Sequence, residues 1–332
     1  MKISILDQAP VYEGASNFQA LQEALRLAQT GEEYGYTRYW IAEHHDLKGL
    51  ACPAPEIMIG YIGGQTKRIR LGSGAVLLPH YKPYKIAEQF NLLATLFPGR
   101  IDLGIGRAPG GSAEASMALS DNFLEKVWKM PELVKELLNF IRGTFASDHL
   151  YAKVKPSPVP DQPPIPWILG TSPKSAVLAA ENGTGYVFGQ FMSDHDPAEI
   201  IQDYYHNHKS NALLPEPNAI LAVSSICALD SDYAQSLAFR NAIGRLKQDK
   251  GEGGGLPGRE EAEHYPLTAD EKGLVEAYKN AIIAGNPSEV GSRLMETAEK
   301  NHVDELMIIT RTPDYQERLV SYQLIGKEII KK

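Results

Sequence analysis

The sequence GRIDLGIGRAPGG occupies residues 99–111 and decides our interpretation of the fold. Residues 100–106 alternate apolar with small or polar residues between a Pro-Gly turn and a glycine-rich loop, a pattern that predicts a buried strand. Glycines at its carboxyl end would let a ligand approach the backbone closely, and Arg107 stands at that opening. We therefore expect a strand that leads into a binding site.

The same glycines come close to the dinucleotide-binding fingerprint G-x-G-x-x-G. Gly104 and Gly106 fit the pattern, but Gly110 comes one residue late and Pro109 lies in the interval. The fingerprint also requires the first turn of the fold and an immediate helix, and the sequence predicts neither at this place. We therefore set a Rossmann-type site aside.

Segments with the composition of buried strands recur along the chain, and helical patterns separate them. The eight predicted strands span residues 3–8, 39–43, 69–76, 100–106, 167–170, 185–188, 220–227 and 305–309. This alternation predicts an α/β fold, a parallel (β/α)8 TIM barrel, as a single domain over residues 1–332. An open, doubly wound sheet is the alternative.

Two insertions interrupt the alternation. After the fourth strand, residues 120–141 have a helical pattern with a kink at Met130-Pro131, and a proline-rich connection follows that cannot join a central sheet. Between the seventh and eighth strands, residues 250–273 are rich in glycine and acidic residues. This flexible segment is either a disordered insertion, which the chain would tolerate at little cost, or a mobile lid.

Composition limits the partners of the chain. A net charge of -8 at pH 7 argues against nucleic acid and anionic membranes, because both call for a basic face. The N-terminus has no apolar signal-peptide region and no run of 18 apolar residues occurs, so we expect a cytoplasmic protein. Cys52 and Cys227 are too few for a disulfide framework and lack metal-ligand spacing.

The second predicted strand ends in Glu43, His44 and His45. TIM barrels keep their functional groups at the carboxyl ends of the strands, and a histidine there can act as a general acid or base near pH 7. Alternatively, the two histidines are solvated or cap local backbone. A third ligand at metal-binding spacing is missing, so we expect no metal site.

A second group of candidates follows the third and fifth strands. Residues 170–175 bring hydroxyls and free backbone N–H groups to a helix start, which suits a phosphate but is also an ordinary helix cap. Arg107, at the end of the neighbouring strand, supplies the cation that a phosphate needs. Small residues at 72–75 would let a flat ring lie against the backbone, or simply allow tight packing against a helix.

Together these segments resemble the bacterial luciferase-like flavin monooxygenases over nearly the whole chain. The matching residues are 40–45, 71–79, 87–93, 99–107 and 170–175. The resemblance implies a TIM barrel, reduced FMN as cosubstrate, oxygenation of a small organic substrate by O2 through a flavin C4a-hydroperoxide, and a homodimer packed through the helices after strands two and three. Since no nicotinamide-binding motif is present, a separate flavin reductase would supply the reduced FMN.

The resemblance also implies roles for single residues. The isoalloxazine ring would contact Gly74 and Ala75, which would be joined by a non-prolyl cis peptide bond. The catalytic residues would be His44, His45 and Glu43, with His44 moving a proton while hydrogen-bonded to Glu43, His45 or water. The remaining contacts to the cofactor, chiefly to its phosphate, would come from Arg107, Gly170, Thr171, Ser172 and Ser175.

The chain departs from the luciferases at two points. Gly106 stands where they carry a reactive cysteine, and residues 108–111 replace a bulky aromatic residue, so we expect a non-luminescent, single-chain member. The alternatives are a deazaflavin-dependent oxidoreductase and a flavin-binding protein without turnover. A metal-free aldolase is disfavoured, since no lysine ends a predicted strand in a position to form a Schiff base.

Two further sets of residues complete the expectations. Side chains at the strand ends are candidates for lining the substrate pocket, namely Gln8, Phe188, Gln190 and Met192. The helices over residues 54–65 and 84–96 carry more apolar residues than one stripe against the barrel needs, which predicts a dimer contact through Ile57, Met58, Tyr61, Phe90 and Leu93.

Overall fold

A closed parallel barrel forms the centre of the computed structural model, which describes residues 1–252 and 255–330. In the order in which they pair, its strands are β10 (Glu305–Ile309), β1 (Lys2–Asp7), β2 (Arg38–Ile41), β3 (Arg70–Ser73), β5 (Ile101–Gly106), β6 (Ile165–Gly170), β7 (Gly185–Gly189) and β8 (Ala219–Cys227). Parallel pairing of β8 with β10 closes the ring. The predicted TIM barrel is therefore confirmed.

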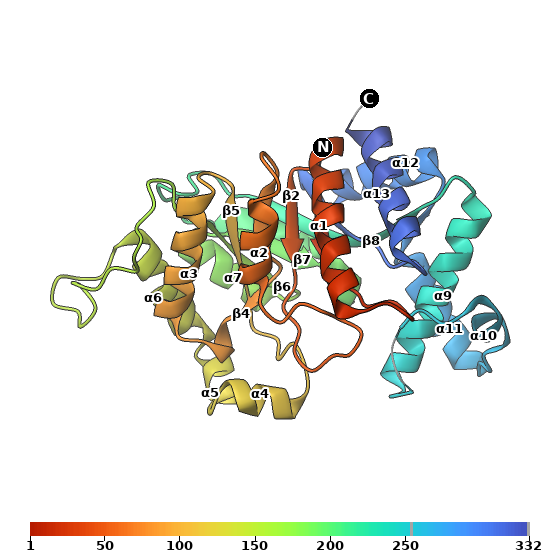
Figure 1. Ribbon diagram of the computed structural model, residues 1–332, viewed down its shortest axis with the longest axis horizontal. Helices are drawn as coiled ribbons and strands as arrows, with labels where there is room; N and C mark the ends of the chain where they lie inside the picture. Colours follow the sequence, from red (N-terminus) through yellow and green to blue (C-terminus); the bar gives the residue numbers. More distant parts are fainter. Residues whose placement is uncertain (253–254, 331–332) are drawn as a thin grey trace.

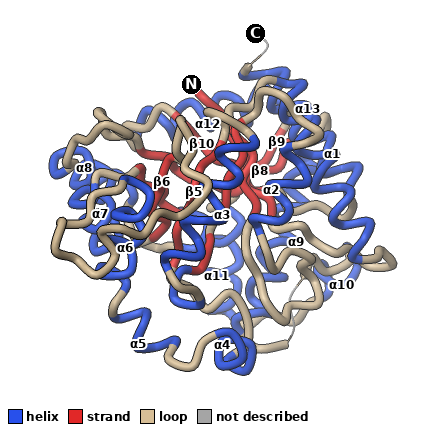
Figure 2. The backbone as a smooth tube through the Cα atoms, turned by 60° about the vertical axis from the view of Figure 1, so that its left-hand side comes forward, coloured by secondary structure: helices blue, strands red, loops and turns tan. Residues whose placement is uncertain are grey.

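Helices surround the strands, as Figures 1 and 2 show. Those that cover the barrel are α1 (Asn17–Tyr34), α2 (Pro55–Gly63), α3 (Pro83–Leu96), α6 (Met130–Arg142), α7 (Pro173–Asn182), α8 (Pro197–Asn207), α12 (Pro287–Lys300) and α13 (Tyr315–Ile329). Proline in the first turn fixes the start of several of them. Asn286 caps α12 and exchanges hydrogen bonds with Glu289, so the two residues form a capping box.

The third predicted strand, residues 69–76, is divided in two. β3 ends at Ser73, and a second short strand, β4 (Val76–Leu77), pairs with the carboxyl end of β5 before the 3-10 turn η1 (Leu78–His80). The Gly74-Ala75 bond between the two strands is cis, as the family resemblance implied.

Side chains fill the barrel interior below its mouth. Trp40 and Trp167 meet edge to face, with their ring centroids 5.6 Å apart, among aliphatic residues of the neighbouring strands. At the amino-terminal end, the Arg38 guanidinium is buried and lies 2.8 Å from Asp102 Oδ2 and 2.7 Å from Glu305 Oε1. These paired charges and the aromatic layer close one end of the barrel, so only the carboxyl end can take a ligand.

Phe188 belongs to a different layer from the one we predicted. Its side chain is fully buried in the cluster between strands and helices, whereas its neighbour Val187 belongs to the cluster inside the barrel. The prediction that Phe188 lines the substrate pocket is therefore wrong. Alternation of side chains along β7 turns this residue outward.

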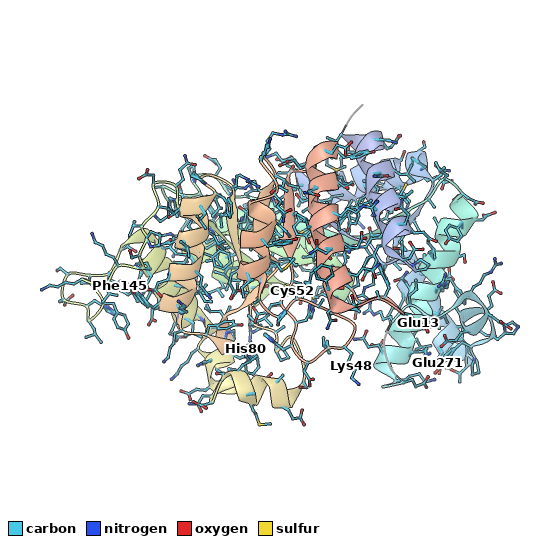
Figure 3. All side chains as sticks on the ribbon, in the orientation of Figure 1. Glu13, Lys48, Cys52, His80, Phe145 and Glu271 are labelled. Atoms are coloured by element: carbon cyan, nitrogen blue, oxygen red, sulfur yellow. The ribbon has the colours of Figure 1, made fainter. Side chains whose placement is uncertain are left out.

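The insertion after the fourth barrel strand contains more helix than predicted. α4 (Ala113–Leu119) and α5 (Phe123–Trp128) precede α6. The helical conformation is interrupted at Lys129, immediately before the predicted kink. Figure 1 shows α4 and α5 beyond the carboxyl ends of the strands. Residues 143–164 form no helix or strand, and Figure 3 labels Phe145 where this segment projects from one side of the molecule. The prediction that the proline-rich connection cannot join the central sheet is wrong for its last proline, because Pro166 lies in β6 opposite Leu103.

The second insertion forms helix over residues 259–264 and 269–273, so a wholly disordered segment is ruled out. α10 (Arg259–His264) and α11 (Ala269–Asn280) pack against α9 (Ser231–Asp249) and share with it a small apolar core of Ala242, Ile243, Leu246, Ala262 and Val275. Gly253 and Gly254 lie outside the described residues. A short strand that the sequence did not predict, β9 (Ile283–Gly285), then pairs with the carboxyl end of β8.

The predicted dimer residues divide into two groups. Met58, Phe90 and Leu93 are buried in the core of the single chain, so they cannot form a contact between copies as predicted. Ile57 and Tyr61 on α2 are 69% and 40% exposed. Among the described residues, none of the helices has the length and apolarity that crossing a membrane requires.

Candidate functional site

The mouth of the barrel lies at the carboxyl ends of the strands. Most strand residues are buried, but the chain becomes partly exposed at Gly74, Leu169, Gly189 and Ser224, on four different strands or just beyond them. Small residues at several of these positions leave room above the aromatic layer. Phe191, in the turn after β7, packs against the barrel interior at this end.

The predicted site residues lie on one arc of this mouth. They follow β2, β3, β5 and β6, which are consecutive neighbours in the barrel. Strands lie about 4.8 Å apart, so the arc spans about 14 Å. It therefore offers an extended ligand a continuous row of contacts from His44 at one end to residues 170–175 at the other.

His44 has an imidazole nitrogen that is available to a ligand. The backbone N–H of His44 donates to the Cys52 carbonyl at 2.9 Å, which fixes the residue in the loop after β2. Its Nδ1 is buried and has no hydrogen-bond partner among the described residues. Burial and, to a smaller extent, the Arg311 charge lower the pKa of His44 to about 4, although Glu43 opposes the shift. His44 is therefore neutral near pH 7, and a buried unpaired nitrogen at the carboxyl end of a barrel strand is typical of a functional site.

Glu43 makes hydrogen bonds to residues that surround His44 and not to His44 itself. Its Oε1 lies 2.7 Å from His45 Nε2 and accepts a hydrogen bond of 2.8 Å from the Tyr81 hydroxyl, while Oε2 accepts one of 3.0 Å from Leu77 N. No hydrogen bond joins Glu43 to His44 in the described part of the chain. The buried carboxylate thereby ties β2 to β4 and η1.

The glycine-rich loop after β5 is held by hydrogen bonds to the segment after β2, which carries His45, and to η1, which carries His80. His45 N donates to the Gly110 carbonyl at 2.8 Å, and His80 Nε2 lies 2.9 Å from the Pro109 carbonyl. Gly110 has a φ of 68°, a conformation that glycine adopts readily. His45 therefore positions the loop that begins with Arg107. His80 was missing from our sequence analysis, although its place directly after Pro79 at a strand end was a signal.

The other candidates at the ends of β3 and β5 leave the backbone accessible. A Cβ atom on Gly74 would lie 2.6 Å from Leu6 Cδ1, so a larger residue there would have to displace the end of the Leu6 side chain. Gly74 nevertheless remains partly exposed beside the buried Ala75. Arg107 is exposed, and its side chain makes no hydrogen bond or ion pair with any described residue. Both features suit a flat ring and an anionic group.

The turn at 170–175 is partly engaged with itself. Ser175 Oγ donates to Ser172 O at 2.6 Å and accepts from Ser172 N at 3.2 Å, and Gly170 has no room for a Cβ beside Ser175. Ser175 thus acts as a local cap of α7. The hydroxyls of Thr171 and Ser172 make no hydrogen bond within residues 1–252 and 255–330, so they are the groups of this turn that could meet a phosphate.

Sequence reasoning missed Arg311, which lies on the opposite side of the mouth. It follows β10, and its Nη2 donates to Gln8 Oε1 at 3.1 Å. Gln8, which we predicted to line the substrate pocket, contacts Arg311, and the candidates Gln190 and Met192 lie in the turn after β7. A basic residue two positions after a predicted strand was the signal, similar to Arg107 after the fourth strand.

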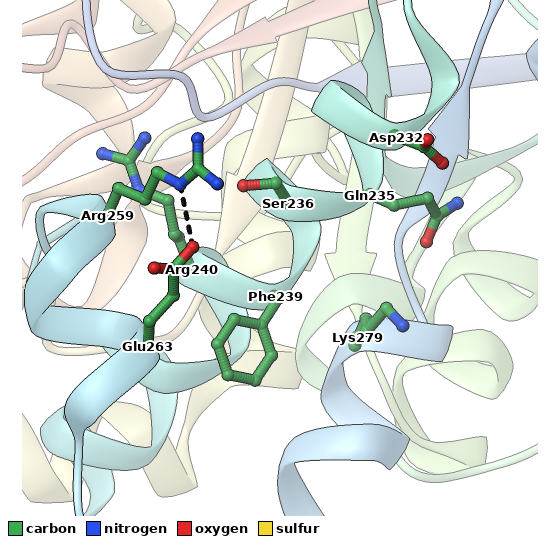
Figure 4. A pocket seen from close by; sticks show the side chains of 8 residues that line it. All are labelled: Asp232, Gln235, Ser236, Phe239, Arg240, Arg259, Glu263 and Lys279. Atoms are coloured by element: carbon green, nitrogen blue, oxygen red, sulfur yellow. Dashed lines mark hydrogen bonds and ion pairs between the residues drawn. The ribbon is translucent and has the colours of Figure 1, made fainter.

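Two other features lie away from this arc. A cleft of about 300 Å³ between α9, α10 and α11 is lined by charged side chains, including the ion pair Arg259–Glu263 that Figure 4 shows. Across the described residues, no three His, Cys, Asp or Glu side chains gather in a way that could hold a metal ion.

The sequence and the fold are both similar to those of known monooxygenases. The model of the luciferase-like monooxygenase family matches residues 1–305. N-acetyl-S-alkylcysteine monooxygenase of Bacillus subtilis (strain 168) is 36% identical over 334 residues, which cover 99% of this chain and 98% of that protein. The crystal structure of apo-MsnO8 is 32% identical with a TM-score of 0.89, and the match covers 98% of both chains.

Two more distant structures share the fold alone. The oxygenating constituent of 3,6-diketocamphane monooxygenase of Pseudomonas putida, in complex with FMN, is 19% identical with a TM-score of 0.72 over 100% of this chain and 98% of that one. An F420-dependent secondary alcohol dehydrogenase, with an F420-acetone adduct, is 16% identical with a TM-score of 0.70 over 99% and 98%.

Proposed function

Because the chain belongs to the luciferase-like monooxygenase family and is a flavin-dependent monooxygenase, we propose that it uses reduced FMN and O2 to oxygenate a small organic substrate at the mouth of its barrel. The observation that carries this proposal is the arc of four adjacent strand ends, with an unpaired guanidinium near one end and an unpaired buried imidazole nitrogen at the other. When bound, reduced flavin supplies the electrons that activate oxygen.

The residues present fit the phosphate of FMN. In the β5–β6 register Gly104 pairs with Trp167 and Ile105 with Ile168, so continuing the register sets Arg107 beside Gly170. The exposed Arg107 guanidinium and the free hydroxyls of Thr171 and Ser172 would hold the anion, and Ser175 would keep α7 in place behind them. The flavin ring would lie against the backbone at Gly74 and Ala75.

His44 is the residue we assign to proton transfer. Its imidazole is neutral above about pH 5 because burial and Arg311 disfavour the charged form. It can therefore accept a proton from a reacting group, a role worth typically 10² to 10⁴ in rate. Glu43 and His45 would be positioning residues, because their hydrogen bonds fix the loop after β2 and the loop after β5 beside His44.

The assembly we propose is a homodimer supplied by a separate flavin reductase. On α2 and α3 the exposed apolar residues Ile57, Tyr61, Leu92 and Leu96 remain uncovered in the single chain. Exposed apolar side chains on two neighbouring helices favour a contact between proteins. Ile57 and Tyr61 belong to the set that the sequence suggested, and Leu92 and Leu96 take the place of its buried members.

Anaerobic titration tests the proposed cofactor. Reduced FMN, reduced riboflavin and a reduced deazaflavin are each added to the protein, and O2 is then admitted with N-acetyl-S-methylcysteine, the substrate class named for the B. subtilis relative. We expect FMN to bind most tightly and to support oxygen consumption. Tighter binding of deazaflavin with no reaction with O2 would favour the dehydrogenase alternative, and flavin binding without any turnover would favour a flavin-binding protein.

A further inference from the structure

Three arginines of the described residues have neither a carboxylate nor a backbone carbonyl as partner. The others bond Asp, Glu or main-chain oxygens, as Arg240 does with Pro257 O and Arg318 with Asp7. The exceptions are Arg107, Arg245 and Arg311. A guanidinium has five N–H donors, so such side chains are open to an anion.

Arg311 uses only one contact of its guanidinium within the described chain. Its Nη2 donates to the neutral amide oxygen of Gln8 at 3.1 Å, which orients the side chain without matching its charge. The backbone carbonyl of Arg311 accepts from Asn241 Nδ2 at 3.1 Å, so the carboxyl half of α9 lies over the end of β10. The remaining donors of Arg311 are free for a ligand.

Arg245 lies one turn after Asn241 on α9, close enough to affect Arg311. It stacks on the Tyr278 ring, with Cζ 4.1 Å from the ring centroid, and has no carboxylate within ion-pair distance in the described structure. Burial lowers the pKa of Arg311, Tyr12 opposes this effect and the Arg245 charge lowers it further. Two uncompensated positive charges therefore stand together, in a chain whose net charge is -8.

The position of this pair separates it from the proposed phosphate site. In the ring of strands β10 stands opposite β5, so Arg311 and Arg107 lie on opposite sides of the mouth. His44 follows β2, midway between them, and its pKa responds to the Arg311 charge. A molecule held by Arg311 would therefore reach across the mouth toward His44.

We propose that Arg311, oriented by Gln8 and assisted by Arg245, binds the carboxylate of the substrate, so that the substrate of this enzyme is a small organic acid. This inference rests on the proposed function only in that substrate and flavin share the mouth. The planar guanidinium matches a carboxylate in a two-point contact that a lysine cannot reproduce.

The test compares acids with their neutral amides. N-acetylmethionine, phenylacetate and hexanoate, each with its carboxamide, are titrated calorimetrically into the flavin-free protein. We expect at least one acid to bind about tenfold or more tightly than its amide. R311Q should abolish that preference and leave FMN affinity unchanged, whereas the control R107Q should keep the preference and weaken FMN.

If no acid binds more tightly than its amide, or if the preference survives in R311Q, the inference is wrong. If R311Q weakens FMN instead, Arg311 serves the cofactor. Should R311Q fail to fold, Gln8→Leu replaces it, with a several-fold smaller preference expected. Because the acid titration needs no flavin, its result is independent of whether FMN is the cofactor.

Discussion

Replacing His44 with glutamine should remove a pH dependence of folding stability. Burial lowers the pKa of His44 to about 4 in the folded chain, against an ordinary value of 6.5. Between these two pH values the unfolded chain binds the proton more readily than the folded one. The stability due to neutral His44 is therefore complete above about pH 6.5 and falls as the pH drops toward 4.

The size of the effect follows from the two pKa values. Linkage gives a loss of about 2 kcal/mol between pH 8 and pH 5, and about 3 kcal/mol once the pH is below 4. Burial also lowers the pKa of His80, which adds a loss of the same sign. The difference between wild type and variant, rather than the wild-type slope alone, therefore isolates His44.

Urea unfolding of wild type and His44→Gln at pH 8 and pH 5 measures this difference. We expect the variant to be less stable than wild type at pH 8, because its amide is buried where the imidazole was, but to lose about 2 kcal/mol less on acidification. His206→Gln, which removes an exposed imidazole from α8, is the control. Parallel losses in wild type and His44→Gln would show that His44 titrates normally, and the neutral imidazole would have to be abandoned.

Four further predictions concern other parts of the molecule. Arg107→Ala should weaken reduced FMN about tenfold in an anaerobic fluorescence titration and leave riboflavin nearly unchanged, because only FMN carries the phosphate; equal losses for both flavins would count against the phosphate site. Tyr81→Phe removes a donor to the buried Glu43 carboxylate and should lower the free energy of unfolding by about 1 to 3 kcal/mol, whereas Tyr84→Phe, whose exposed hydroxyl meets Lys155 O at 3.3 Å, should change it little. Ile57→Asp with Leu96→Asp should give a monomer by light scattering, while Leu124→Asp on α5 should not; a monomeric wild type at micromolar concentration would end the dimer proposal. If residues 250–273 act as a lid, exchanging 256–264 for a Gly-Ser linker should preserve FMN affinity but raise the hydrogen peroxide released per O2 consumed, because water enters; an unchanged ratio would leave only a surface insertion.

The barrel could be predicted because the chain repeats one local pattern. Strand-like and helical segments alternate from Ile3 to the last helix, and each barrel strand stands close to its predicted place. The division of the third strand could not be predicted from periodicity, because residues 69–76 contain only three large apolar side chains, Ile69, Leu71 and Val76. It depends instead on the pairing of Val76 and Leu77 with β5, which is a tertiary contact.

The second insertion shows how composition can mislead. Glycines and acidic residues around 250–273 outweighed a weak helical signal, since α10 and α11 each bury few apolar residues. Ala262 and Val275 become core residues only when α9 supplies the facing side chains. A short amphipathic helix of this kind gains its stability from the packing partner rather than from its own sequence.

The residues of the candidate site could likewise be predicted only in part. Glu43, His44, Arg107 and residues 170–175 could be chosen because they directly follow predicted strands. The partners that give them their properties could not, because they come from distant parts of the chain. Tyr81 and Leu77 hold the Glu43 carboxylate, and Arg311 acts on His44 from the other end of the sequence.

A crystal structure of the chain with FMN tests the central claim most directly. We predict the phosphate in contact with Arg107 and with the hydroxyls of Thr171 and Ser172, and the ring against Gly74 and Ala75 with His44 beside it. Flavin bound elsewhere, for example in the cleft between α9, α10 and α11, or a phosphate held by Arg311 instead of Arg107, would contradict the account.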